Sequence, residues 1–476
     1  MARHELTGDE VHTWNIVKGS ATFPELIHNS RYEGHPPDWY ALLWPLSRLT
    51  HDAGAIQILH WAIASGVAFL ILFQSPLPLP ARLLVPFGYY FLFEYAILSR
   101  NYAIGVLLGC GICVVLGRKD REGTFPYYLL LFGMSNAHLL AAVLAGSLHL
   151  CVLLRMHQRG RTRGALFRHA FLGALVLLPC AYFIFPPADS ALNAASWRAK
   201  WSAQQVLAFG QVPLRSFLPV PAWWNHNFWN TQVLLEARNS FPVFRLVNRL
   251  VVVLILGAAC FVLWKRTPSL LLFGANFGVS FVVAAAAFPL TTARYSGFLY
   301  IGFVLALWLA CAEVSLSRGR AFFVHLLLVV QVVAGLFAAW KDVREPFSNL
   351  FRIVDLVREV PPDSRLVTDY WTMNAYSAFV DKPIYCVDMR RSLSLILFDR
   401  SLAEALKDEA RYSAGFREIF RQDRPKAVYM VSLSSPEKLG RIDRDLEQAF
   451  HVAVVDRRVG AIDRNGDLYL YRITPR

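Results

Sequence analysis

Two adjacent acids near the amino end, Asp9 and Glu10, are the first residues whose types could do chemistry. A carboxylate on an exposed loop can take the proton from an attacking hydroxyl or amine and so act as a general base. His12 follows closely, and carboxylate and imidazole groups are also ligands of divalent metals. The spacing supplies no further ligand. A divalent metal at Asp9, Glu10 and His12 therefore stays an alternative to general-base catalysis, and no other cofactor is indicated.

A second polar group, Glu33 and His35, precedes two prolines in the segment RYEGHPPDWYALLWPL. Proline cannot donate a backbone hydrogen bond inside a helix, but it suits the first turn. We therefore expect a helix over Asp38–Leu49 that enters the membrane, with Glu33 and His35 on the loop that faces outwards.

The apolar segment FLFEYAILSRNYA carries one acid, Glu94, followed by Arg100 and Tyr102. An acid inside a membrane is costly unless it is paired or faces a polar cavity. Glu94 could form a buried ion pair with an arginine that only holds helices together. Alternatively, Arg100 at the helix end could bind a phosphate near the membrane surface, because the guanidinium fork matches phosphate oxygens.

Three more residues fall at the ends of apolar segments. His138 lies in FGMSNAHLLAAVLAG, and a single histidine there is often only a hydrogen-bonded structural group. Arg294 and Tyr295, in PLTTARYSGF, repeat the arrangement of Arg100 and Tyr102. Several cations and one acidic pair on the same membrane face could bind a lipid-anchored phosphate beside a carboxylate that acts as a base.

The segments that must position these residues are apolar and long. The chain has 476 residues, of which 55% are apolar and only 17% charged, whereas soluble domains carry about 25% charged residues. Hydrocarbon cores of roughly 30 Å need apolar helices of about twenty residues. We expect about ten crossings, which run approximately over Ala53–Phe73, Leu83–Ser99, Tyr102–Leu116, Phe125–Ser135, Ala137–Leu154, Ala165–Phe185, Phe244–Trp264, Ser269–Pro289, Tyr295–Glu313 and Ala321–Trp340.

We expect three domains: a first outer loop (1–38), a transmembrane helical domain (39–340) and a soluble domain (341–476). The balance of charge changes at the second of these boundaries. Residues 1–340 hold 25 Lys and Arg against 13 Asp and Glu, an excess of +12, and the remainder holds 23 against 21, an excess of +2. Much of the basic excess lies in short links between apolar segments, where it sets topology. This distribution argues against nucleic acid as a partner.

The basic links predict which side of the membrane each segment faces. GRKDREG, RMHQRGRTRG and SRGR are cytoplasmic by the positive-inside rule. The first loop, the Ser99–Asn101 turn, the Pro186–Phe241 link and the C-terminal domain are then extracytoplasmic. Arg245 and Arg249 are exceptions at an outer helix end. They could extend toward lipid headgroups, or they could form an anion site.

The C-terminal region reads as a small α/β domain. Strand-like runs rich in Val, Ile and Tyr alternate with helical candidates at Ser401–Ala410 and Pro436–Phe450. The expected strands are Arg365–Thr368, Pro383–Val387, Ala427–Leu433, Val452–Arg457 and Asp467–Ile473. Since the region has no Gly-rich phosphate-binding motif, we expect it to cap the site or to bind an acceptor.

Taken together, these motifs resemble membrane glycosyltransferases of the GT-C superfamily. The order is an outer-loop Asp-Glu, then acid-x-His-Pro-Pro, then Ser-Arg-Asn-Tyr at a helix end. The resemblance is to the protein O-mannosyltransferase and aminoarabinose-transferase branch, and EGHPPDWY with FEYAILSRNYA looks like a bacterial subgroup of it. The family has a first transmembrane helix ahead of the Asp-Glu motif. We therefore expect a first crossing upstream of Met1.

The resemblance implies that a sugar moves from a polyprenyl-phosphate donor to a lipid, glycan or protein acceptor, with inversion, at the outer face of the inner membrane. Asp9 would be the base, and Arg100 or Arg294 would stabilise charge on the departing phosphate. Glu10, Glu33 and His35 would orient the base or the acceptor. The main rival is a transporter or flippase for a lipid-linked or anionic substrate. Many transporters consist of two structurally related halves and bind their substrate near the middle of the bilayer. The sequence shows no internal repeat of this kind. A non-catalytic membrane scaffold is the third alternative.

Overall fold

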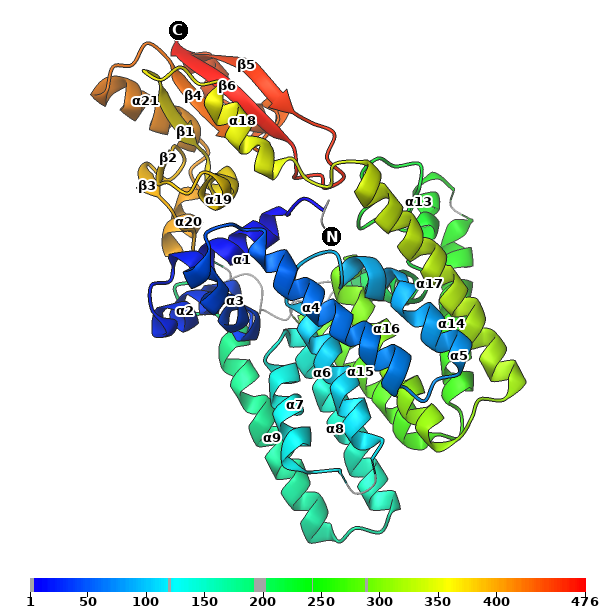
Figure 1. The fold of residues 1–476 in the computed structure, drawn as a ribbon. Helices are drawn as coiled ribbons and strands as arrows, with labels where there is room; N and C mark the ends of the chain where they lie inside the picture. Colours follow the sequence, from blue (N-terminus) through cyan, green and yellow to red (C-terminus); the bar gives the residue numbers. More distant parts are fainter. Residues whose placement is uncertain (1–3, 119–120, 192–202, 242, 287–289) are drawn as a thin grey trace.

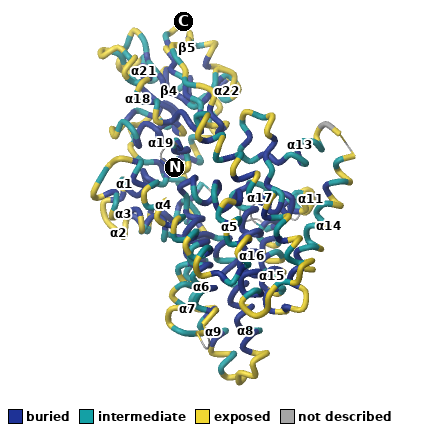
Figure 2. Tube along the Cα trace, turned by 45° about the vertical axis from the view of Figure 1, so that its right-hand side comes forward, coloured by how far each residue is buried: buried dark blue, intermediate teal, exposed yellow. Residues whose placement is uncertain are grey.

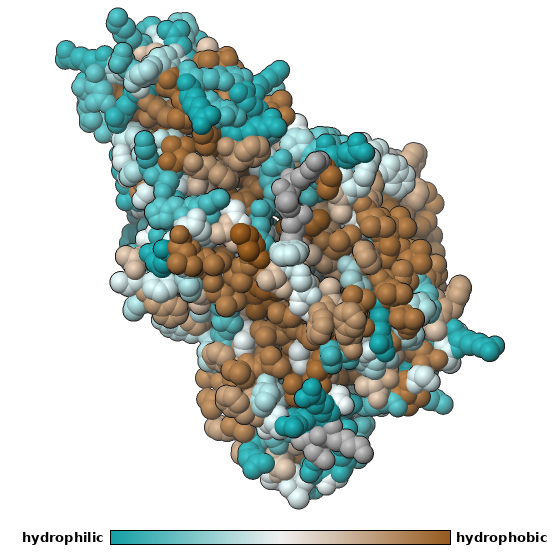
Figure 3. Space-filling view, viewed as in Figure 1, coloured by the Kyte–Doolittle hydropathy of each residue, from teal (hydrophilic) through white to brown (hydrophobic). Residues whose placement is uncertain are grey.

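The computed structural model of the chain describes residues 4–118, 121–191, 203–241, 243–286 and 290–476. Figure 1 shows a helical part below, a sheet domain at the top left, and the first helices of the chain between them. Side chains on the helical part are mostly apolar at the surface, whereas those of the sheet domain are mostly polar (Figure 3). The chain is a polytopic helical membrane protein with a C-terminal α/β domain.

Seven described helical segments are long and apolar enough to cross a membrane, by length and composition. They are α4 with the adjoining η2 (Ala55–Gln74), α8 (Leu139–Gln158), α9 (Arg163–Ile184), α14 (Phe244–Leu263), α15 (Thr267–Ala286), α16 (Ala293–Glu313) and α17 (Arg318–Arg344). Two shorter apolar helices, α6 (Tyr102–Leu116) and α7 (Phe125–Ser135), complete the bundle. Residues 287–289, where the eighth predicted crossing ends, lie outside the described residues.

The second predicted crossing, Leu83–Ser99, is wrong as a single helix. Its residues form the end of α5 (Leu79–Leu84), a 3₁₀ turn η3 (Val85–Phe87) and a π turn η4 (Tyr90–Glu94). Pro86 and Gly88 interrupt the helix, because proline lacks a backbone donor and glycine does not favour helical backbone. Such irregular backbone is tolerated at membrane depth where protein covers it, and η4 packs against α16 and α17.

The amino-terminal segment is helical rather than an open loop. Thr7 and Glu10 form a capping box that starts α1 (Gly8–Gly19). Reciprocal hydrogen bonds of this kind satisfy backbone donors at a helix start. A second capping box starts α2 (Phe23–Ser30), which leads into η1 (Arg31–Glu33). The predicted helix Asp38–Leu49 is confirmed with the same bounds as α3.

The C-terminal domain is a six-stranded mixed sheet with the order β3-β2-β1-β4-β6-β5. The two pairings of β1, with β2 and β4, are parallel, and Val367 lies opposite Met430. The remaining pairs are antiparallel. The strands are β1 (Arg365–Thr368), β2 (Ile384–Cys386), β3 (Arg391–Leu393), β4 (Val428–Ser432), β5 (Phe450–Arg458) and β6 (Leu468–Pro475).

Five of these strands occupy the predicted runs, and β3 was missed because three residues carry almost no periodic signal. The predicted helix Ser401–Ala410 ends early, as α20 (Arg400–Ala405). The predicted helix Pro436–Phe450 splits into α22 (Pro436–Ile442) and α23 (Leu446–Ala449). The remaining helices of the domain are η5 (Leu350–Arg352), α18 (Ile353–Arg358), α19 (Tyr370–Phe379) and α21 (Arg411–Gln422).

The sheet domain rests on the amino-terminal helices. Helix α19 packs against α1, and the residues between them are buried (Figure 2). Lys18 of α1 bonds the carbonyl of Ser377 at 2.7 Å and pairs with Asp381 at 2.6 Å. The link between α9 and α14 contains α11 (Ala203–Phe209), α12 (Val212–Phe217) and α13 (Val233–Ser240).

Candidate active site

One oxygen of Asp9 pairs with two arginines that are distant in sequence. Its Oδ2 accepts a hydrogen bond from Nη1 of Arg100 and another from Nη1 of Arg294, the latter at 2.7 Å. The Asp9 side chain remains half exposed, whereas both arginine side chains are mostly buried. Partial burial opposes ionisation, but Arg100 and then Arg294 hold the pKa of Asp9 well below its usual range. Asp9 is therefore a carboxylate at neutral pH.

Three different elements bring these groups together. Asp9 stands in the first turn of α1, where an acid is favoured by the helix dipole. Arg100 follows the irregular η4 segment and precedes α6, and Arg294 begins α16. Each guanidinium also lies over the tyrosine close to it in sequence, at 5.5 Å from the Tyr102 ring and 5.1 Å from the Tyr295 ring. Cation–π contacts of this kind hold an arginine against an aromatic ring without neutralising its charge.

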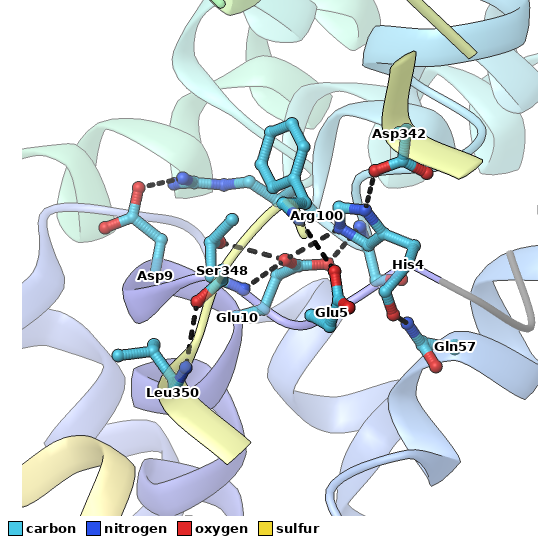
Figure 4. Close-up of polar contacts among 12 residues, drawn as sticks. His4, Glu5, Asp9, Glu10, Gln57, Arg100, Asp342, Ser348 and Leu350 are labelled. Atoms are coloured by element: carbon cyan, nitrogen blue, oxygen red, sulfur yellow. Dashed lines mark hydrogen bonds and ion pairs between the residues drawn. The ribbon is translucent and has the colours of Figure 1, made fainter. Parts of the chain in front are cut away.

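Glu10 points away from Asp9 and is completely buried (Figure 4). Its Oε1 accepts a hydrogen bond from the backbone N–H of Ser99 at 2.5 Å, and its Oε2 accepts one from Thr7 N–H at 2.8 Å. His4 lies 3.5 Å from the same Oε2 and hydrogen-bonds Asp342 of α17 at 2.7 Å. Glu10 thus connects the start of α1 to the turn that carries Arg100, which is a positioning role.

Glu33 and His12 form a pair beneath the C-terminal domain. His12 Nε2 lies 2.9 Å from Glu33 Oε1, and His12 Nδ1 lies 3.1 Å from Oδ1 of Asn374 in α19. Burial disfavours the charged imidazole, but the charge of Glu33 and the hydrogen bond to it raise the pKa of His12. Asp9, Glu10 and His12 therefore have separate partners. No group of three or more His, Cys, Asp or Glu side chains in the described part of the chain is arranged to hold a metal ion.

His35 and His138 lie together with Tyr102 and Tyr295. The ring centroids of His35 and His138 are 5.4 Å apart, and those of His138 and Tyr102 are 4.5 Å apart. His138 caps α8 by accepting a hydrogen bond from Leu140 N–H at 3.1 Å, which is the structural role that the sequence left open. Burial and then the charges of Arg100 and Arg294 lower the pKa of His35 to about 4. A neutral His35 can accept or donate a hydrogen bond beside the two cations.

Glu94 bonds neutral groups instead of an arginine. Its Oε2 accepts hydrogen bonds from Trp229 Nε1 at 3.2 Å and Tyr89 Oη at 3.3 Å. The buried ion pair with an arginine, one of the two alternatives that the sequence left open, is therefore absent among the hydrogen bonds and ion pairs of the described residues. Because Trp229 belongs to the link between α9 and α14, Glu94 anchors that link to the η4 segment.

Asp463 is a buried acid, electrostatically coupled to Asp9, that sequence reasoning missed. It is buried in a loop of the C-terminal domain, where Asp463 N–H bonds the carbonyl of Phe347 at 2.9 Å. Burial raises the pKa of Asp463 to about 6, and the charge of Asp9 contributes in the same direction. The only sequence signal was an acid in the turn DRNG, which is typical of any solvated loop.

No family model and no curated protein matches the chain. Among solved structures, it is similar to ArnT from Cupriavidus metallidurans in the apo state, with 13% identity and a TM-score of 0.44 over 98% of this chain and 94% of that one. It is also similar to the same protein bound to undecaprenyl phosphate, with 13% identity and a TM-score of 0.42 over 99% and 94% of the two chains.

Proposed function

We propose that the protein is a membrane glycosyltransferase that moves a sugar from a polyprenyl-phosphate donor to an acceptor hydroxyl or amine. The observation that carries the proposal is the Asp9 carboxylate between the guanidinium groups of Arg100 and Arg294. A base and two phosphate-binding cations are then in contact before any substrate arrives. The acceptor is a lipid, a glycan or a protein.

The chemistry needs only one carboxylate. A glycosidase uses two, since its alcohol leaving group must be protonated. A lipid phosphate leaves as a stable anion, and arginines can stabilise the charge that develops on it. One base for the acceptor and one cationic site for the phosphate are sufficient, and Asp9 with its two arginines supplies both.

Donor binding would also activate the base. In the present structure the two cations hold the pKa of Asp9 low, which makes it a weak base. A phosphate that binds Arg100 and Arg294 competes for their N–H groups and releases the carboxylate. The proton affinity of Asp9 then rises at the moment when an acceptor proton must be taken.

The transfer is balanced in one displacement. The acceptor oxygen or nitrogen forms a bond to the anomeric carbon, and the bond from that carbon to the phosphate oxygen breaks. The electron pair leaves with polyprenyl phosphate, and the acceptor proton goes to Asp9. Attack opposite the leaving phosphate inverts the anomeric centre. His35 and Tyr102 border the cations and are placed to orient donor or acceptor, while Glu10 and Glu33 act through Arg100 and His12.

The proposed location is the inner membrane, with the Asp9 site and the C-terminal domain on the extracytoplasmic face. The basic links of the sequence support this orientation, because the positive-inside rule assigns such links to the cytoplasm. The C-terminal domain covers the amino-terminal helices through His12 and Lys18, so it would limit the access of water and of acceptors to the site.

The test is Asp9→Asn in the full chain, assayed with a panel of polyprenyl-phosphate sugars and native membranes as the acceptor source. We expect transfer to fall by at least about 100-fold, the typical contribution of a general base, while donor binding persists because both arginines remain. Asp355→Asn, an exposed acid of α18, is the matched control and should transfer normally. Transfer by Asp9→Asn close to that of wild type would remove Asp9 as the base.

A further inference from the structure

A second cationic site lies among the helices α11, α12, α13 and α14, on the side of the molecule away from α1. Figures 1 and 2 both place α13 and α14 at the opposite edge from the amino-terminal helices. A cavity of about 600 Å³ opens there and is lined by three arginines, Arg238, Arg245 and Arg249. No Asp or Glu is among the described side chains that line it. Asp9, Arg100 and Arg294 are not part of it.

Two of the three arginines stand where a helix disfavours them, whereas Arg238 lies in the last turn of α13, where a cation is favoured. Arg245 and Arg249 are in the first two turns of α14, four residues apart. The amino end of a helix repels cations, and like charges at this spacing destabilise it further. The positive-inside rule also disfavours cations at the predicted outer end of a crossing. An anion bound in the cavity would offset the repulsion of the two arginines by the helix dipole and by each other.

The walls of the cavity suit a ligand that is both charged and apolar. Leu207 and Val252 line it beside the arginines. Directly along α14, Leu246 and Leu250 are 60% and 54% exposed, as expected for a helix that faces lipid. A ligand can therefore place its charged group among the guanidinium groups and its chains along the exposed side of α14.

Asn248 supplies a further polar group for such a ligand. It is 5% exposed, lines the cavity, and donates a hydrogen bond to the carbonyl of Leu234 at 3.1 Å. Its buried Oδ1 has no partner among the described residues. A buried unsatisfied acceptor is costly, and a water molecule that donates to both this amide oxygen and the bound phosphate would satisfy it.

We infer that this cavity binds the phosphate of an anionic lipid, separately from the site at Asp9. Three guanidinium groups without a carboxylate favour a doubly charged phosphomonoester over a singly charged phosphodiester, because each added charge gains a charge-assisted contact. The inference does not depend on sugar transfer, so lipid binding can be measured even if the proposed reaction fails.

The test measures binding of fluorescent phosphatidic acid, a phosphomonoester lipid, to the full-length protein in neutral detergent. We expect the double variant Arg245→Gln with Arg249→Gln to bind at least about tenfold more weakly, from the loss of charge-assisted hydrogen bonds. Arg318→Gln, at the exposed start of α17, is the matched control and should bind as wild type does. Equal binding by the double variant would overturn the inference.

Two competitors separate the sources of phosphate. Unlabelled phosphatidic acid should displace the probe, whereas the same concentration of inorganic phosphate should not. Displacement by inorganic phosphate at equal concentration would show a free-phosphate site and overturn the lipid assignment. As a check on folding, phosphatidic acid should raise the melting temperature of wild type and Arg318→Gln but not that of the double variant. An equal rise in the double variant would also contradict the inference.

Discussion

Glu10 accepts a hydrogen bond from the backbone N–H of Ser99 at 2.5 Å, across 89 positions in the chain. This contact fixes the residue directly before Arg100 to the first turn of the helix that carries Asp9. The distance between Asp9 and Arg100 is therefore set by a buried acid next to Asp9, and not by the exposed side chains alone. The two adjacent acids of the motif have different tasks.

Glu10→Ala should destabilise the protein strongly. It leaves the N–H groups of Thr7 and Ser99 without their acceptor and His4 without one of its two acids. We expect a loss of about 3 kcal/mol, typical of breaking a buried charged contact, seen as a lower melting temperature in detergent. The matched control is Glu25→Ala, because Glu25 occupies the equivalent position in the exposed capping box of α2. Its loss should lower the melting temperature much less. Equal effects would show that Glu10 acts only as a helix cap.

The His4 contacts predict a stability that decreases with rising pH. Burial disfavours charge on His4, but hydrogen bonds to Asp342 and Glu10 raise its pKa to about 10, from an ordinary value of 6.5. The folded protein therefore binds one proton more than the unfolded chain between these values. The stabilisation is complete below pH 6.5 and is lost as pH rises toward 10, at up to about 1.4 kcal/mol per pH unit.

Melting temperatures between pH 6 and pH 10 check this prediction. His4→Gln should flatten the decline, and His157→Gln, an exposed histidine at the end of α8, should leave it unchanged. A wild-type curve with the same slope as His4→Gln would show that His4 is not protonated in the folded state.

Arg294→Gln should change both the rate of sugar transfer and its pH dependence. Loss of one of the two cations that we propose bind the phosphate should lower kcat by about 100-fold. The charge of Arg294 also lowers the pKa of Asp9, so its removal raises that pKa. Because the base must be ionised in the free enzyme, the acidic limb of kcat/KM should shift to higher pH. Profiles of Arg294→Gln and Arg318→Gln, compared with wild type, separate this effect from a general loss of folding.

The proposed orientation predicts which surfaces are reached from outside the cell. Arg400→Cys places a thiol on the exposed start of α20, and His157→Cys places one in the link predicted to be cytoplasmic. With exposed Cys260 changed to Ser in both, an impermeant maleimide should label intact cells only through Arg400→Cys. Labelling of only His157→Cys would reverse the orientation.

Local signals predicted much of the helical framework. The prolines before Asp38 marked the start of α3, and sustained apolar runs marked the long helices. The capping box at Thr7 and Glu10 was also readable, although the segment was interpreted as a loop on account of its polar composition. The break inside Leu83–Ser99 was not predicted, because hydropathy is insensitive to the backbone effects of Pro86 and Gly88 that cause it.

The sequence alone determined that the chain needs a membrane, where its long helices lie, and which few polar residues could do chemistry. These properties depend on composition and on neighbours along the chain. Only the tertiary structure decided that Asp9 contacts Arg100 and Arg294, that Glu10 faces inward, and that Asp463 is buried. The physical reason is that contacts between distant segments depend on how helices and sheet pack, and no local pattern encodes that packing.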